Sequence, residues 1–287
     1  MKVGMIGLGA MGMGMARNVA KSGYLTGVYN RTVNKAQSLA EELNVKSYQE
    51  PEALAAEVSI ILICVSADQD VLDMVTAITK TIKPGSVVVD MSTVSSATAL
   101  KAAEMLSAYQ VDFLDAPVSG GVEGAKNGAL AMMVGGEPNI LENVKPILAS
   151  MAARIMHMGE IGAGQATKAV NQIMCAGINQ AVTEALAFAQ IQGLPMDKVI
   201  DVISGGASGN WFLQHRGLTM TNESFAPGFK LALHHKDLKI CQAMADTQGV
   251  ALPLADLTVT AYEQLMAEGY GDEDISALYR LKYHPSI

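Results

Sequence analysis

The sequence predicts an α/β protein in which an N-terminal doubly wound sheet precedes an all-α C-terminal domain. Up to about His157, short apolar runs alternate with helix-like stretches, as in a parallel sheet that helices cover on both faces. From Gln165 onward the apolar positions recur only at helical spacing. The pattern changes near Gly159 and Gly162, so we expect two domains, residues 1–160 and 161–287.

Six short runs are expected to form the strands of the sheet. Their nearly continuous apolar character is typical of strands that are buried on both faces. The runs are Lys2–Ile6, Leu25–Tyr29, Val58–Val65, Ser86–Asp90, Val111–Asp115 and Ala129–Val134. The helices expected between them are Met11–Ser22, Val33–Leu43, Gln69–Thr81 and Ala97–Ala108. Strict alternation of this kind predicts βαβ units in one open sheet.

The C-terminal domain begins with a long, alanine-rich stretch, Gln165–Gln192, that is expected to form one helix. This helix has more apolar surface than one small domain can cover, which predicts a homodimer or a homotetramer. The further helices expected are Met196–Ile203, Leu231–Gln248 and Leu254–Glu268.

Composition excludes several classes of partner. The 287 residues carry a formal net charge of −8, whereas nucleic acids and anionic membranes attract clusters of Lys and Arg. No apolar run reaches half of the roughly 20 residues that a membrane span needs, and the apolar pattern starts at Val3 without a leader. Cys64, Cys175 and Cys241 are widely spaced and read as reduced, buried thiols. We therefore expect a cytoplasmic protein without nucleic-acid or membrane partners.

A glycine-rich loop follows the first expected strand and opens the first expected helix. Gly7, Gly9 and Gly12 have the G-x-G-x-x-G spacing. The first glycine allows a tight turn, the second lets the backbone approach a pyrophosphate, and the third allows close helix–strand packing. In this position the motif predicts a Rossmann domain that binds a dinucleotide. The loop residues expected to contact it are Gly7, Leu8, Gly9, Ala10, Met11 and Gly12.

The end of the second expected strand indicates which dinucleotide is bound. NAD-dependent proteins place an acidic residue there for the ribose 2′-hydroxyl, but this sequence has Asn30, Arg31 and Thr32. An arginine pairs with a 2′-phosphate, and the two polar neighbours can donate hydrogen bonds to it. We therefore expect NADP(H) as the cofactor, in preference to NAD.

Five stretches, in the same order, resemble the β-hydroxyacid dehydrogenase family, which includes 3-hydroxyisobutyrate dehydrogenase, tartronate semialdehyde reductase and the glyoxylate/succinic semialdehyde reductases. They are Gly7–Gly14, Asp90–Ser95, Asp115–Gly121, Gly162–Gln172 and His235–Leu238. The resemblance covers nearly the whole chain. It implies hydride transfer between a nicotinamide cofactor and a small hydroxy acid or semialdehyde that carries a carboxylate.

Lys168 is the candidate catalytic residue. It lies one turn into the long apolar helix, where a buried lysine is costly. Burial lowers the pKa of a lysine, which suits it to proton transfer, although a lysine that extends to solvent is the alternative. The resemblance implies that Lys168 is the general acid and base that accompanies hydride transfer.

The resemblance also implies which residues hold the substrate. Ser119, Gly120 and Gly121 would bind its carboxylate through a hydroxyl and unhindered backbone N–H groups. The family places an amide one turn after its lysine, often an asparagine at i+4. Here Asn171 is at i+3 and Gln172 at i+4, so we favour Asn171 and keep Gln172 as the alternative.

Further residues are implied to lie near the cofactor, namely Val65, Ser66, Thr93 and Lys236, with Asp237 supporting the network. His234 and His235 are adjacent and diverge on a helix, so we expect no metal site. Trp211 and Phe212 are more typical of core than of a substrate pocket.

Two rival functions and the identity of the substrate stay open. An imine reductase resembles this family but generally lacks the lysine, and a non-catalytic NADP-binding module would not need Lys168 and Ser119. The segment Ser119–Gly136 is closer to the 3-hydroxyisobutyrate and tartronate semialdehyde branches, whereas Gly269–Arg280 is closer to the glyoxylate/succinic semialdehyde branch.

Overall fold

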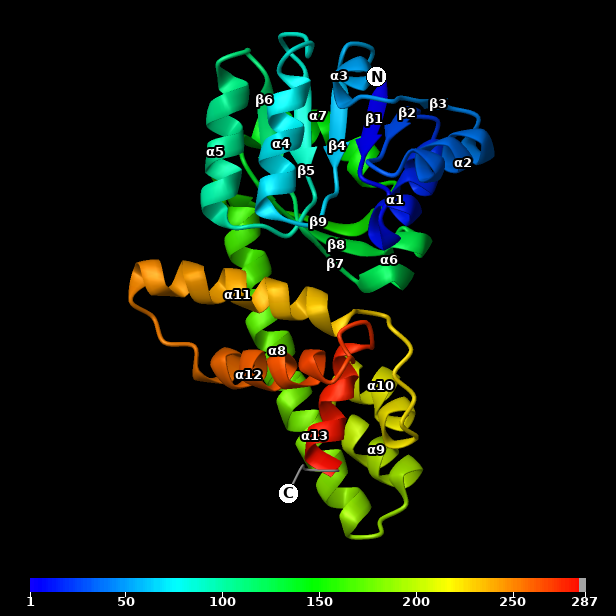
Figure 1. The fold of residues 1–287 in the computed structure, drawn as a ribbon, viewed down its shortest axis with the longest axis vertical. Coiled ribbons are helices and arrows are strands. Elements are labelled where there is room, and N and C mark those ends of the chain that lie inside the picture. The colour runs from blue at the N-terminus through cyan, green and yellow to red at the C-terminus, as the bar shows by residue number, and fades with distance from the viewer. Residues whose placement is uncertain (284–287) are drawn as a thin grey trace. The chain divides into compact units, whose positions relative to one another are not determined.

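A computed structural model describes residues 1–283 of the chain (Figure 1). The chain forms two compact units, Met1–Lys168 and the segment from Ala169 onward. The first unit contains all the strands of one nine-stranded sheet, and the second is helical.

The sheet of the first unit has the strand order of a Rossmann fold. Its strands are β1 (Val3–Ile6), β2 (Leu25–Tyr29), β3 (Lys46–Ser47), β4 (Ile60–Ile63), β5 (Val87–Asp90), β6 (Asp112–Asp115), β7 (Val118–Ser119), β8 (Leu130–Gly135) and β9 (Ala152–Gly159). They are arranged β3-β2-β1-β4-β5-β6-β8-β7, and β9 pairs with β8. The first six strands are all parallel. Ligands of such sheets bind beyond the carboxyl ends of the strands, at the point where neighbouring strands connect to opposite sides of the sheet. Here that point lies between β1, which leads to β2, and β4, which leads to β5.

Helices cover both faces of this sheet, as the sequence predicted. They are α1 (Ala10–Lys21), α2 (Val33–Leu43), α3 (Pro51–Ala55), α4 (Asp68–Ile78), α5 (Ser96–Ser107), α6 (Gly121–Asn127) and α7 (Pro138–Leu148). Met5 and Leu62 belong to the apolar core that includes residues of α1, α2 and α7. Ile61 and Ile63 belong to a second core with residues of α3, α4 and α5. The strands are thus buried on both sides, which explains their continuous apolar sequences.

The edge of the sheet beyond β6 differs from the prediction. Ala129–Val134 was expected to extend the parallel sheet, but β8 is antiparallel to both β6 and β7. This expectation was wrong because β6 and β8 are joined through the short strand β7 and the helix α6 instead of a long crossover helix. The strands β3 and β7 have only two residues each, too few to form the apolar run by which the other strands were predicted. The helix α7 was not predicted, and it contains Pro146, a residue that is unfavourable inside a helix.

The second unit is built from helices, in agreement with the predicted class. They are α8 (Ala163–Ile191, which begins in the first unit), α9 (Met196–Ser204), α10 (Trp211–Thr221), α11 (Leu231–Gln248), α12 (Pro253–Ala267), a 3₁₀ turn η1 (Ile275–Tyr279) and α13 (Arg280–Tyr283). Leu238 and Tyr262 are fully buried in its core. Within residues 1–283, no helix combines the length and apolar character needed to cross a membrane.

None of the three cysteines is in a disulfide bond, but they are less uniformly buried than expected. Cys241 is buried, whereas Cys64 and Cys175 are half-buried. The expectation of three buried thiols was wrong for these two. Cys64 directly follows β4 and packs, partly buried, against the core of the first unit.

Candidate active site

The glycine-rich loop has the geometry that its motif requires. Gly7 has a φ of +93°, and a β-carbon on it would lie 2.1 Å from the carbonyl oxygen of Cys64. A β-carbon on Gly12 would lie 2.1 Å from the carbonyl oxygen of Gly7. Gly9 is different, because nothing lies within 4 Å of the place where its β-carbon would be. The loop is therefore closed on its inner side and open at Gly9.

The open side of the loop fits the pyrophosphate of a dinucleotide. Gly9 is the N-cap of α1 and has no side chain that could cap the helix, and the first turn contains no acidic residue. The N–H groups and the positive end of the helix dipole at such a terminus attract an anion. Asn30 supports the loop, since its Oδ1 accepts a hydrogen bond of 2.9 Å from the Leu8 N–H. Its Nδ2 donates to the Thr32 carbonyl oxygen at 3.2 Å.

Arg31 and Thr32 lie at the surface directly after β2. The Arg31 side chain is 87% exposed, and its Nη1 is 3.4 Å from Oδ1 of Asp70. Exposed ion pairs of this kind contribute little, so the guanidinium is easily redirected toward an anion. Asn30, in contrast, uses both ends of its amide within the loop region, which gives it a bracing role that the sequence did not reveal.

The loops after β4 and β5 are bonded to each other through Ser92, which a buried carboxyl group holds in place. The Val65 N–H donates to Oγ of Ser92 at 2.9 Å, and the Ser92 N–H donates to Oδ1 of Asp90 at 3.0 Å. Asp90 is fully buried. Burial raises its pKa to about 6, and the neighbouring carboxylate of Asp115 adds to this effect against the hydrogen bonds from Ser92. Thr93, which follows Ser92, is half-buried.

Asp115, at the end of β6, holds the beginning of α8. Its Oδ1 accepts a hydrogen bond of 2.7 Å from the Gly162 N–H, and its Oδ2 accepts one of 2.8 Å from the Gln165 N–H. The carboxyl group is fully buried. Burial raises its pKa, and the backbone hydrogen bonds from Gly162 and Gln165 oppose the increase. Lys168 follows one turn later on α8 and is only 7% exposed.

Ser119 ends β7 and is half-buried, and Gly120 and Gly121 follow it at the start of α6. Gly120 is exposed, so its backbone is accessible. These three residues belong to the same unit as Lys168 and the glycine-rich loop. Asp115 and Gln165 were not predicted as site residues, although both lie inside stretches that resemble the family.

In the second unit, Gln172 is central to a buried polar network. Its Nε2 donates to Oδ2 of Asp237 at 2.7 Å, and its Oε1 accepts a hydrogen bond of 2.8 Å from Nδ2 of Asn171. Nζ of Lys236 lies 3.0 Å from Oδ1 of Asp237. Four of the residues that the sequence singled out are therefore brought together here. Both ends of the Gln172 amide are already engaged within this network.

The adjacent histidines have separate surroundings. The buried His234 contacts the Tyr262 hydroxyl through Nδ1 at 3.0 Å and the Gln172 carbonyl oxygen through Nε2 at 3.2 Å. Because a carbonyl oxygen only accepts, Nε2 carries the hydrogen, and in the neutral ring Nδ1 accepts from Tyr262. Nε2 of His235 lies 3.4 Å from Oε1 of Glu263. Among the described residues, no group of three or more His, Cys, Asp or Glu side chains is placed to hold a metal ion.

The aromatic pair at the start of α10 is divided between surface and core. Trp211 is 60% exposed and stacks on the His215 ring at a centroid distance of 4.2 Å, whereas Phe212 is buried. Only Phe212 is therefore a core residue.

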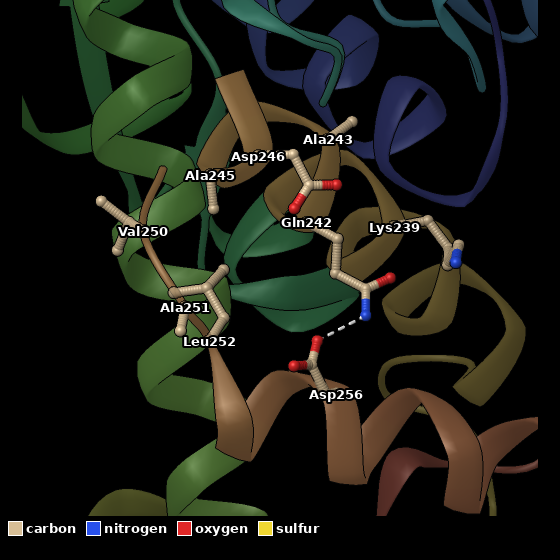
Figure 2. A pocket seen from close by; sticks show the side chains of 9 residues that line it. All are labelled: Lys239, Gln242, Ala243, Ala245, Asp246, Val250, Ala251, Leu252 and Asp256. Atoms are coloured by element: carbon tan, nitrogen blue, oxygen red, sulfur yellow. Dashed lines mark hydrogen bonds between the residues drawn. The ribbon is translucent and has the colours of Figure 1, made fainter. Parts of the chain in front are cut away.

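A separate hollow of about 540 Å³ lies in the second unit between α11 and the start of α12 (Figure 2). Figure 2 shows Gln242 reaching across it to Asp256, where Nε2 donates to Oδ1 at 2.7 Å. Its lining contains none of the predicted site residues. The hollow is therefore separate from the residues that the sequence predicts for the site.

Comparison with known proteins gives matches over nearly the whole chain. Residues 2–159 match a family model described as the NAD binding domain of 6-phosphogluconate dehydrogenase. Residues 162–282 match one described as NAD-binding of NADP-dependent 3-hydroxyisobutyrate dehydrogenase.

Individual relatives are similar over the same length. A 2-hydroxy-3-oxopropionate reductase from Escherichia coli is 34% identical, with 97% of this chain and 96% of the relative covered. A 2-(hydroxymethyl)glutarate dehydrogenase from Eubacterium barkeri is 33% identical over 98% of this chain and 94% of the relative. The structure of 3-hydroxyisobutyrate dehydrogenase from Mycobacterium tuberculosis with L-serine is 31% identical, covers 97% of this chain and 98% of its own, and superimposes with a TM-score of 0.88.

Proposed function

Because the chain belongs to the β-hydroxyacid dehydrogenase family and is an NAD(P)-binding oxidoreductase, we propose that it transfers hydride between NADP(H) and a small carboxylate-bearing semialdehyde or hydroxy acid. The observation that supports this proposal best is the placement of Lys168. It is buried one turn after the point where Asp115 holds α8, in the same unit as the glycine-rich loop. A buried lysine in this position suits proton transfer.

The cofactor is NADP(H) in this proposal. Bound at the glycine-rich loop, it supplies or accepts the hydride. The N–H groups at the start of α1 bind the pyrophosphate, and the open side of Gly9 leaves room for it. Arg31, exposed and weakly paired, binds the 2′-phosphate with Thr32. A carboxylate in place of Arg31 would instead select NAD.

The chain's own residues orient the substrate and move the proton. Ser119, Gly120 and Gly121 bind the substrate carboxylate. During reduction Nζ of Lys168 gives a proton to the aldehyde oxygen, and during oxidation it takes the proton from the hydroxyl group. Asn171 is the amide that contacts the substrate in this proposal, because Gln172 uses both its oxygen and its nitrogen within the network, whereas the bond between the two residues uses only Nδ2 of Asn171.

The expected substrates are short semialdehydes. Relatives are named for the reduction of 2-hydroxy-3-oxopropionate and for 2-(hydroxymethyl)glutarate, both of which carry a carboxylate near the reacting carbon. We propose reduction of one of methylmalonate, tartronate or succinic semialdehyde, or of glyoxylate. Differences of one methyl or hydroxyl group among these change discrimination by only about 1–3 kcal/mol in an apolar pocket.

The test is NADPH oxidation at 340 nm with these four compounds, run beside NADH. Turnover with NADPH that exceeds turnover with NADH, and that is lost in Lys168→Ala, supports the proposal. If the wild-type protein binds NADPH but reduces none of the four compounds, the small-acid assignment fails. Imines would then be the next substrates to measure, before a non-catalytic role.

We also propose that the enzyme is a homodimer or a homotetramer in the cytoplasm. The helix α8 exposes large apolar side chains, with Met174 61%, Phe188 65% and Ile191 65% exposed. A second copy of the chain would cover such a surface. Light scattering coupled to size exclusion should give a multiple of 30.2 kDa, and Phe188→Glu should lower it.

A further inference from the structure

Gln165 is a buried amide whose two ends are both bonded to the loop after β5. The residue is the third of α8 and only 1% exposed. Its Nε2 donates to the Ser92 carbonyl oxygen at 2.9 Å, and its Oε1 accepts from the Val94 N–H at 3.2 Å. The two bonds reach the residues immediately before and after Thr93. A planar amide bonded in this way cannot rotate without losing both bonds.

The backbone of Gln165 is fixed as firmly as its side chain. Its N–H donates to the buried carboxylate of Asp115. Lys168 follows three residues later on the same helix, so its starting position is set by the same anchor. The loop that Gln165 holds is in turn bonded to the loop after β4, since Oγ of Ser92 accepts from the Val65 N–H. One side chain thus connects the expected cofactor loops to the turn that precedes Lys168.

We propose that Gln165 is a positioning residue that fixes the Thr93 loop relative to Lys168, so that the groups for hydride transfer and proton transfer keep the correct relative geometry. This inference rests on the proposed function, in which Thr93 lies near the nicotinamide ribose and Lys168 moves the proton. Reaction rates depend steeply on such geometry, and a displacement of about 1 Å can reduce a rate about 100-fold. Loss of the bridge should therefore affect the chemical step more than substrate binding.

The first experiment compares Gln165→Met with Gln180→Met. Gln180 is a matched control, because it is also a buried glutamine of α8, is 6% exposed, and donates through Nε2 to Oγ1 of Thr258 at 3.2 Å. Both variants lose a buried amide, and both should melt at a lower temperature than the wild type. Gln165→Met should lower kcat by about 10- to 100-fold with KM for the substrate within about threefold of the wild type. Gln180→Met should keep kcat within about threefold of the wild type, by the same reasoning.

The second experiment uses Gln165→Glu as a conservative variant with a pH-dependent proton. A protonated carboxyl group has the shape of the amide and can donate to the Ser92 carbonyl oxygen while it accepts from Val94. The ionised form cannot donate. Burial near the carboxylate of Asp115 raises the pKa of such a group. The ratio of variant kcat to wild-type kcat, measured at intervals of about one pH unit, should therefore rise as pH falls from about 8 toward about 5. A merely structural loss would give a constant ratio.

A third measurement needs neither cofactor nor turnover. The Val94 N–H has Oε1 of Gln165 as its acceptor, so hydrogen exchange of the segment 92–95 should accelerate at least about tenfold in Gln165→Met and remain unchanged in Gln180→Met. Equal kcat values for the two methionine variants, or unchanged exchange in Gln165→Met, would overturn the positioning role while leaving the proposed function intact. A wild-type protein without any turnover overturns both.

Discussion

Replacing Asp90 by asparagine removes a buried carboxyl group whose ionisation is unfavourable in the folded protein. Asp90 ends β5, and its Oδ1 accepts the Ser92 N–H at 3.0 Å. Its Oδ2 is buried and has no hydrogen-bond partner in the described part of the chain. Asparagine keeps the acceptor and the shape of the side chain but does not titrate. The pH dependence contributed by this position should therefore disappear in Asp90→Asn.

The size of the effect follows from the change in pKa. Burial raises the pKa of Asp90 from 3.8 to about 6. A difference of about 2 units corresponds to about 3 kcal/mol of unfolding free energy, at about 1.4 kcal/mol per unit. Because the pKa is raised in the folded state, this stability is fully present below about pH 3.8 and is lost as pH rises through about 6. The wild type should thus lose about 3 kcal/mol relative to Asp90→Asn between about pH 3 and about pH 7.5.

Urea unfolding at several pH values, followed by far-UV circular dichroism, measures this difference. The single tryptophan, Trp211, lies in the second unit, so its fluorescence reports unfolding of that unit separately. The comparison of the two proteins at each pH cancels the titration of other groups. A difference in unfolding free energy that stays constant within about 0.5 kcal/mol over this range refutes the argument from burial.

Two further predictions concern cofactor binding. Gly12→Ala places a β-carbon 2.1 Å from the carbonyl oxygen of Gly7 and should destabilise the protein by about 1–3 kcal/mol. The β-carbon of Gly9→Ala enters open space, so this variant should keep the wild-type melting temperature but raise the Kd for NADPH at least about tenfold. Thermal melts with and without NADPH distinguish the two variants. Arg31→Glu should lower the ratio of kcat/KM for NADPH over NADH by about 100-fold, because a carboxylate repels the 2′-phosphate; an unchanged ratio would assign cofactor choice to other residues.

Features that depend on local sequence could be predicted, and those that depend on distant pairing could not. The glycine-rich loop is specified within a few residues, and the helix Val33–Leu43 has the bounds that its periodicity predicted. The antiparallel pairing of β8 depends on β6 and β7, and nothing within Ala129–Val134 records the direction of its neighbours. The edge of the sheet was therefore missed.

The same limit applies to the candidate site. The role of Asp115 depends on the Gly162 N–H, 47 residues later, and that of Gln165 on the Ser92 carbonyl oxygen, 73 residues earlier. Helical spacing left Asn171 and Gln172 as alternatives, since both lie one turn after Lys168. The bond from Gln172 to Asp237, on which our preference for Asn171 rests, joins residues 65 positions apart. A lysine in an apolar helix left proton transfer and extension to solvent as alternatives for Lys168, and the family resemblance favoured proton transfer.

The rate of a single turnover with saturating NADPH tests the proton-transfer role of Lys168 most directly. The measurement compares wild type and Lys168→Ala, with NADPH binding followed separately by fluorescence and with the substrate that the 340 nm assay identifies. General acid catalysis contributes about 10²- to 10⁴-fold, so Lys168→Ala should lose at least about 100-fold in this rate while its Kd for NADPH stays within about threefold of the wild type. A variant that binds NADPH normally and keeps the wild-type rate within about threefold would contradict the account.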